Sequence, residues 1–183
     1  MFDLEELIAD CRATASVDRS HRHIREVVAR AVSKPTDLFK ALGEPKRAAI
    51  QTLYCSPNLT VLNVIWAPMM TIMPHDHRMW AVIGMYSGRE DNIFWRRIAD
   101  DPSGKIEAAG ARSLQKGDTE LLGGNIVHSV TNPIPRLSCA IHVYGGDFFA
   151  AERSEWDAET LLEGSFDADA AVRRFEETNK ASR

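Results

Sequence analysis

The chain has 183 residues, of which 44% are hydrophobic and 26% are charged, values typical of a globular domain with one apolar core. The formal net charge is -4 and no basic run stands out, which argues against nucleic acid and anionic membrane surfaces as partners. The acidic start does not look like a signal peptide, no segment is apolar enough to span a membrane, and the 3 cysteines form no close pair. We therefore expect a cytoplasmic protein with reduced thiols.

Residues 1–50 are expected to form a helical cap. Apolar residues recur at helical spacing over Leu4–Cys11 and again over Ile24–Ala31, before which Ser20 is a candidate N-cap. A third helix is expected over Pro35–Leu42, because proline suits the first turn of a helix.

Residues 51–149 change to short β-rich runs separated by turn residues, a pattern typical of a sandwich or barrel. The expected strands are Thr60–Trp66, Met70–His77, Trp80–Tyr86, Asn92–Ile98, Lys105–Ala108, Ala111–Leu114, Glu120–Leu122, Ile126–Val130 and Ser138–Tyr144. Because turn-forming Gly, Asp, Asn and Pro separate them, the pattern favours a β-barrel over alternating strands and helices.

Residues 150–183 return to a helical pattern, with one helix expected over Ser154–Leu162 and a second over Asp167–Thr178. No repeat or low-complexity linker separates the three parts of the chain. We therefore expect residues 1–183 to form a single domain, with helices at both ends of one barrel.

Two histidines, His75 and His77, are separated by one residue in an expected strand. Side chains two residues apart on a strand point to the same face, so both imidazoles can converge inside a barrel. His21 and His23 have the same spacing in a helical pattern, where about 200° of rotation makes them diverge, and we interpret them as surface histidines. With His128 on a later strand, His75 and His77 form a candidate metal site; the alternative is a metal-free barrel with ordinary buried histidines.

The segment Pro74–Gly88 resembles the first motif of the cupin superfamily, which reads His-x-His, then Glu, then Gly. His75, His77 and Gly88 match, whereas Ala81 stands where the motif has its Glu ligand.

The segment Gly117–Asn132 is similar to the second cupin motif, in which Gly, Pro-x-Gly, His and Asn follow one another. His128 and both ends of the segment match, while Gly123 replaces the Pro and Asn125 replaces the Gly. The two resemblances imply a mainly β fold, the cupin double-stranded β-helix barrel, and one divalent metal held by His75, His77 and His128.

Ligand type alone does not name the metal, since imidazole binds iron, copper, nickel and zinc. With Ala81 in place of a carboxylate, three neutral imidazoles leave the charge of a divalent ion uncompensated. This favours an incoming anionic ligand such as a thiolate, an enolate or hydroxide, and a six-coordinate ion would keep open positions for substrate and dioxygen.

Residues 140–144 resemble the Ser-x-His-x-Tyr run of the cysteine dioxygenase and thiol dioxygenase group within the cupins. His142 and Tyr144 match, and Ala140 replaces the Ser. The resemblance implies Fe(II) that adds both atoms of dioxygen to a thiol sulfur, with His142 and Tyr144 as catalytic residues that stabilise bound oxygen or move a proton. The alternative is that both side chains complete the core.

Two departures from that group concern the substrate. Val82 stands where some members have a Cys that crosslinks to the Tyr, and no Arg occurs around Leu53–Cys55, where cysteine dioxygenases bind the substrate carboxylate. Arg78, Arg96 and Arg97 are candidate replacements. We therefore expect a substrate other than cysteine.

The polar segment Ser87–Asn92 is interpreted as a solvated turn. The alternative is that Glu90 or Asn92 hydrogen-bonds to a metal-ligating histidine from behind.

The sequence thus predicts a metal-dependent cupin oxidoreductase, an iron(II) dioxygenase acting on a small thiol or similar anionic donor, whose partners are a small-molecule substrate and dioxygen. The alternatives are a cupin with a non-redox zinc or nickel site, a manganese site, or a binding protein without turnover. Substrate, native metal and oligomeric state are left open.

Overall fold

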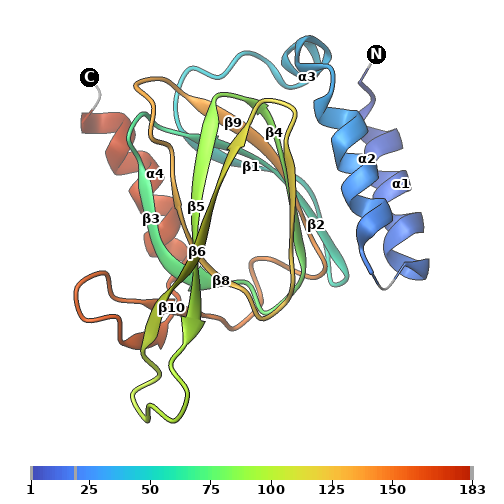
Figure 1. Ribbon diagram of the computed structural model, residues 1–183. Helices are drawn as coiled ribbons and strands as arrows, with labels where there is room; N and C mark the ends of the chain where they lie inside the picture. The colour runs from blue at the N-terminus through green and yellow to red at the C-terminus, as the bar shows by residue number, and fades with distance from the viewer. Residues whose placement is uncertain (1, 19, 182–183) are drawn as a thin grey trace.

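Two antiparallel β-sheets face each other and form a barrel in the middle of the chain (Figure 1). The structure, a computed structural model, describes residues 2–18 and 20–181. The first sheet has the order β1-β2-β9-β4-β7, and the second has the order β11-β10-β3-β8-β5-β6. The strands are β1 Ala49–Ser56, β2 Leu59–Trp66, β3 Thr71–Asp76, β4 Ala81–Ser87, β5 Arg89–Arg97, β6 Ile106–Gln115, β7 Thr119–Leu122, β8 Val127–Thr131, β9 Ser138–Tyr144, β10 Ser154–Trp156 and β11 Glu163–Ser165.

Both faces of the three inner strands of the first sheet, β2, β9 and β4, are buried, which explains why these strands are apolar along their length. On β2, Leu62 and Val64 face the barrel interior, whereas Val61 and Ile65 face the helices. A strand buried on both sides needs apolar residues at successive positions rather than at alternate ones, and every residue of β2 is buried.

The helices α1 Leu4–Val17, α2 Arg22–Val32 and α3 Pro35–Leu42 confirm the predicted cap, and α1 and α2 lie beside the first sheet in Figure 1. The helix α2 approaches β4 closely at Gly84, where a Cβ atom would collide with Val28. The α2 helix therefore packs directly on the sheet backbone.

The expected role of Ser20 was wrong. The N-cap of α2 is His21, which has a φ of 57° and makes no side-chain cap hydrogen bond. Instead, the Asp18 carboxylate accepts from the His23 backbone N–H at 2.9 Å. His23 is exposed as expected, but His21 is half-buried and stacks on Trp80 with ring centroids 4.6 Å apart.

The C-terminal segment differs from the expectation of two helices. Residues 154–162 are not helical, because β10 pairs with β3 and with β11. Trp156 is buried beside Ile106 and Val127, and its indole N–H donates to the carbonyl of Gly104 at 2.9 Å. A single buried anchor of this kind holds a short strand, whereas an amphipathic helix needs a repeated apolar stripe.

The second predicted C-terminal helix is confirmed as α4, Ala168–Ala181, on the opposite side of the barrel from α1 and α2 (Figure 1). Its Phe175 packs on Trp66 with ring centroids 5.4 Å apart. The Asn179 side chain hydrogen-bonds the backbone N–H and C=O of Ala48 at 2.8 and 2.9 Å. These contacts fix α4 against the start of β1.

Two further differences concern strands. β1 was not among the expected strands, and the two runs expected over Lys105–Ala108 and Ala111–Leu114 form the single strand β6, whose pairing with β5 is interrupted by a bulge at Phe94 and Trp95. A bulge adds a residue to a strand without ending it. The sequence analysis therefore interpreted the break between the two expected runs as a turn, although the strand continues through it.

The architecture confirms the expected fold class, a mainly β double-stranded β-helix barrel with flanking helices. The three cysteines are free thiols. Within residues 2–18 and 20–181, no helix combines the length and the apolar character that a membrane crossing requires.

Candidate metal centre

Strands β3 and β8 bring the three candidate ligands together. In the antiparallel pairing of these strands His75 lies directly opposite His128, and His77 is the first residue beyond β3. A bulge between Ile72 and His75 sets this register, and it contains Pro74, which has no N–H to give to the ladder. The predicted convergence of the three imidazoles is therefore a consequence of strand pairing.

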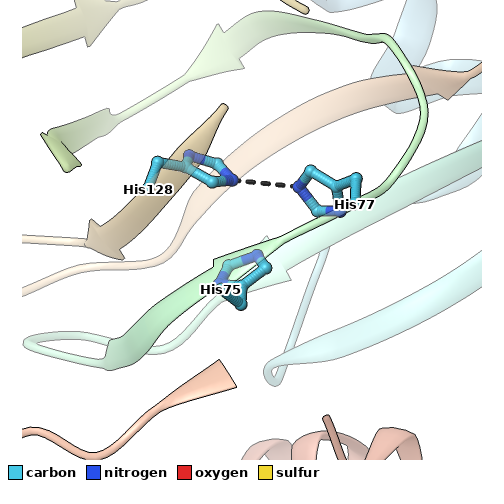
Figure 2. A group of neighbouring side chains, drawn as sticks. All are labelled: His75, His77 and His128. Atoms are coloured by element: carbon cyan, nitrogen blue, oxygen red, sulfur yellow. Dashed lines mark hydrogen bonds between the residues drawn. The ribbon is translucent and has the colours of Figure 1, made fainter. Parts of the chain in front are cut away.

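The three side chains are buried, with 6%, 6% and 1% of His75, His77 and His128 exposed, and their ligand atoms all lie within 4.8 Å of one another. Figure 2 shows the three rings facing one point, with Nε2 of His77 2.9 Å from Nε2 of His128. Nitrogen ligands that share an ion at bonds of about 2.0–2.1 Å lie about 3 Å apart, which is the spacing of the His77 and His128 nitrogens.

Burial keeps these imidazoles neutral. It lowers the pKa of His75 from 6.5 to about 4 and lowers the pKa values of His77 and His128 well below the usual range. The neighbouring histidines lower the pKa of His77 further. A neutral imidazole has the lone pair that a metal requires, so the cluster suits an ion at neutral pH.

The tautomers of two histidines follow from their partners. Nδ1 of His75 lies 2.9 Å from the carbonyl oxygen of Met73, and Nδ1 of His128 lies 2.7 Å from Oδ1 of Asn92. Because both oxygens only accept hydrogen bonds, each Nδ1 carries the proton and each Nε2 keeps its lone pair. His75 and His128 are therefore arranged to bind a metal through Nε2.

His77 has a different partner. Its Nδ1 lies 3.3 Å from the Arg153 guanidinium, which only donates hydrogen bonds, so Nδ1 accepts and the proton sits on Nε2, facing His128. For a neutral His77 to bind a metal through Nε2, its proton has to move to Nδ1. The guanidinium then loses this acceptor and is free for another one.

Arg153 is placed by the residue between the two histidines of the motif. Asp76 points away from the cavity, and its carboxylate accepts from the Ser154 backbone N–H at 2.9 Å and pairs with Arg78 at 2.6 Å. The hydrogen bond from Ser154 to Asp76 fixes β10 beside β3, and it thereby holds the preceding residue, Arg153, at the cavity wall.

A cavity of about 50 Å³ lies beside the three histidines. The polar side chains of His142, Tyr144 and Arg153 line it. Much of the remaining wall is formed by the large rings of Trp66, Phe148, Phe166 and Phe175. The predicted catalytic pair thus lies at the cavity, with Nδ1 of His142 2.9 Å from the Tyr144 hydroxyl. Burial raises the pKa of Tyr144, so its hydroxyl keeps its proton at neutral pH.

The arginines expected at the cavity lie elsewhere. Arg78 pairs with Asp76 as described, Arg96 pairs with Glu107 at 2.7 Å, and Arg97 pairs with Glu163 at 2.6 Å. Arg153 lines the cavity instead. The sequence analysis did not identify this residue, because it expected a helix over Ser154–Leu162 rather than a strand beside the site. Only the pairing of β10 with β3 directs this part of the chain to the site.

The interpretation of Ser87–Asn92 as a solvated turn was wrong. The turn is limited to Gly88, with a φ of 76°, and β5 begins at Arg89. Glu90 and Asn92 are 0% and 1% exposed. Asn92 is the hydrogen-bond partner of His128 that the alternative interpretation considered.

No protein-family model matches the chain. An RmlC-like cupin family protein with a double-stranded β-helix fold from Methanocaldococcus jannaschii is 8% identical over 58% of this chain and 86% of that chain, with a TM-score of 0.47. A double-stranded β-helix protein from Klebsiella pneumoniae is 12% identical over 68% and 88% of the two chains, with a TM-score of 0.43. A cupin superfamily protein from Desulfitobacterium hafniense is 10% identical over 57% and 82%, with a TM-score of 0.44.

Because all three TM-scores lie below 0.5 and all three identities are 12% or lower, the chemistry of the site has to be argued from the chain's own residues.

Proposed function

We propose that the protein is an iron(II)-dependent dioxygenase that acts on a small thiol, or a similar anionic donor, bearing a second negative charge. One observation carries this proposal: three neutral imidazoles, a hydrogen-bonded His–Tyr pair and a buried guanidinium line the same small cavity.

The metal would be held by His75, His77 and His128, all neutral ligands. When bound, iron(II) would supply a centre that accepts a thiolate and activates dioxygen. The overall reaction, RSH + O2 giving RSO2H, places both oxygen atoms on sulfur and needs no external reductant. Ala81, in the position of the motif's Glu, faces the interior and lies opposite Tyr144, so no carboxylate at that position competes with an anionic substrate.

Arg153 would bind the second negative charge of the substrate. Its guanidinium lies between the rings of Phe148 and Phe166, 4.0 and 4.2 Å from their centroids, and donates to the Phe148 carbonyl at 3.0 Å. Its Nε is buried without a hydrogen-bond partner, and no carboxylate among the described residues forms a salt bridge with it. Burial lowers its pKa, but a guanidinium stays charged at neutral pH. A buried cation that no carboxylate contacts directly is costly, and a carboxylate on the substrate would offset that cost.

Tyr144 and His142 would handle the proton of the reaction. The Tyr144 hydroxyl is protonated at neutral pH and can be arranged in two ways. Its oxygen accepts from Nδ1–H of His142 while its own proton is donated towards the cavity, or the hydroxyl donates its proton to Nδ1 of His142. The aromatic residues around the pair exclude water, so the hydroxyl has few competing partners. The small cavity restricts the substrate to a compact molecule.

Oxygen consumption by protein reconstituted anaerobically with iron(II) tests the proposal. The panel should contain small thiols with a carboxylate, with an amine, with both groups and with neither. We expect equal consumption of thiol and dioxygen, formation of a sulfinate, and preference for the thiols with a carboxylate. Full iron occupancy without oxygen consumption on any thiol of the panel would contradict the proposal.

Metal analysis of protein from unsupplemented cells distinguishes the alternative. Three histidines and one water are also a catalytic zinc arrangement. Iron as the main metal agrees with the dioxygenase, whereas zinc or nickel as the main metal contradicts it.

A further inference from the structure

A buried carboxylate lies behind the site without touching the cavity. Glu90 on β5 is 0% exposed. Its Oε2 accepts from the indole N–H of Trp66 at 3.0 Å, and its Oε1 accepts from the side-chain amide of Asn92 at 3.0 Å. None of the salt bridges among the described residues joins Glu90 to Lys or Arg, so the carboxylate is held by neutral donors.

The Glu90 carboxylate determines which way the Asn92 amide points. A carboxylate only accepts hydrogen bonds, so the NH2 group of Asn92 faces Glu90 and its carbonyl oxygen faces Nδ1 of His128 at 2.7 Å. The reversed amide would place two acceptors against each other at Glu90. The carboxylate therefore excludes the reversed orientation.

The amide orientation in turn determines the tautomer of His128. With the Asn92 oxygen facing it, Nδ1 carries the proton and Nε2 has its lone pair directed to the other two histidines. With the amide reversed, Nδ1 would accept and Nε2 would carry the proton, which prevents a neutral imidazole from binding a metal there. The chain from Glu90 through Asn92 to His128 thus has one arrangement compatible with a metal.

Glu90 also faces the catalytic pair. Its Oε2 lies 3.7 Å from Nε2 of His142, whose Nδ1 contacts the Tyr144 hydroxyl. One carboxylate therefore lies next to both halves of the site, the ligand His128 through Asn92 and the pair of His142 and Tyr144 directly.

We propose that Glu90 is a positioning residue of the metal centre, which fixes the Nδ1–H tautomer of His128 through Asn92. The proposal rests on the metal site of the proposed function, and it is independent of which substrate is oxidised. Folding alone does not require this carboxylate, because a buried acid without a cationic partner costs free energy that an apolar side chain of similar size avoids.

Two substitutions in combination test the proposal. In Glu90→Gln, the side-chain oxygen accepts from Trp66 and the new NH2 group faces Asn92, which reverses the Asn92 amide and puts the proton of His128 on Nε2. In Asn92→Asp, two carboxylates face each other across a 3.0 Å contact. In the double variant, the carboxylate introduced by Asn92→Asp accepts both from the amide introduced by Glu90→Gln and from His128, which restores the Nδ1–H tautomer.

The measurement is affinity for Co(II) and Zn(II), by competition with a chromophoric chelator, with circular dichroism to confirm folding. We expect Glu90→Gln to lose about 10- to 100-fold in affinity and the double variant to recover most of this loss, whereas Asn92→Asp should lose less, because its carboxylate still accepts from Nδ1–H of His128. The matched control is Asn63→Ala, which removes a buried side chain bonded to Gln51 and Tyr86 on the other side of the sheet; it should leave metal affinity unchanged.

Glu90→Gln with the affinity of the parent protein, or a double variant that recovers none of the Glu90→Gln loss, would overturn the proposal. Long-range ¹H–¹⁵N spectra of the parent protein give a second test that needs no variant. They should show the Nδ1–H tautomer for His128, and the Nε2–H tautomer would overturn the proposal. A parent protein that binds metal but consumes no dioxygen contradicts only the dioxygenase function, whereas a parent that binds no metal contradicts both.

Discussion

The two faces of the first sheet are made by the same strands but differ in chemistry. On β9, Ile141 and Val143 face the helices, while His142 lines the cavity and Tyr144 packs in the interior core. The helix side is filled almost entirely by apolar side chains, whereas the cavity side faces four buried imidazoles, a guanidinium and a carboxylate, of which His142 alone belongs to the first sheet. Buried polar groups reduce stability unless each has a partner. Their concentration on one face therefore indicates that this face is arranged for binding and chemistry, and the other for stability.

The largest expected effect comes from removing a ligand on the cavity side. His128→Ala should abolish retention of a divalent metal and with it oxygen consumption, because two imidazoles do not hold an ion against dilution. Metal analysis after gel filtration measures the effect, and His21→Ala, whose parent side chain stacks on Trp80, is the control. Metal retained at full occupancy by His128→Ala would show that the ligands have been assigned incorrectly.

A substitution on the helix side should change stability but not metal binding. Ile141→Ala removes a fully buried side chain and should lower the free energy of unfolding by about 2–5 kcal/mol. Urea unfolding measures the loss, and chelator competition on the folded protein should show unchanged metal affinity. A large loss of affinity would mean that the two faces are not independent.

Arg153→Met should separate substrate binding from metal binding. For a thiol with a carboxylate, kcat/KM should fall about 10- to 100-fold, because a charge-assisted hydrogen bond is lost. Metal affinity should not fall, since Arg153 donates to His77 only in the tautomer that does not bind metal. Arg96→Met, whose parent side chain pairs with Glu107, is the control. Equal loss for thiols without a second charge would argue against binding of the anion by Arg153.

The smallest expected effect is the pH dependence of the metal-free protein. The unfolded chain takes up a proton at His75 near pH 6.5, whereas burial holds the pKa of His75 in the folded chain at about 4. The unfolded state therefore binds more protons in this window, and the free energy of unfolding should fall as pH is lowered from about 6.5 to about 4. His75→Gln should reduce the slope, while a substitution at exposed His23 should not. A free energy of unfolding that does not change over this pH range would contradict the conclusion that His75 is buried in its neutral form.

Local patterns predicted most of the fold. The second and third helices of the cap, seven of the strands and the helix α4 agree with the expected segments within a few residues, and α1 begins where expected but extends to Val17. The errors lie where one long-range contact replaces a local pattern. Trp156 holds residues 154–156 in a strand through its burial beside Ile106 and Val127, and β1 is a strand because β2 and α4 pack on it.

The candidate site was predicted in part for the same reason. The sequence identified His75, His77, His128, His142 and Tyr144, and the structure brings all five to one cavity, although their roles stay predictions. Arg153 and the burial of Glu90 were missed, since nothing in their local sequence distinguishes them from surface residues.

The sequence by itself determined which side chains share a strand face, because alternation has a period of two residues and depends on neighbouring positions alone. The sequence therefore determined that the side chains of His75 and His77 point to the same side, and likewise those of His142 and Tyr144. Only the tertiary structure decided that His128 lies opposite His75, that β10 carries Arg153 to the cavity wall, and that Glu90 is enclosed behind Asn92. These decisions depend on which strands pair and what covers them, and such contacts join positions that are distant in the chain.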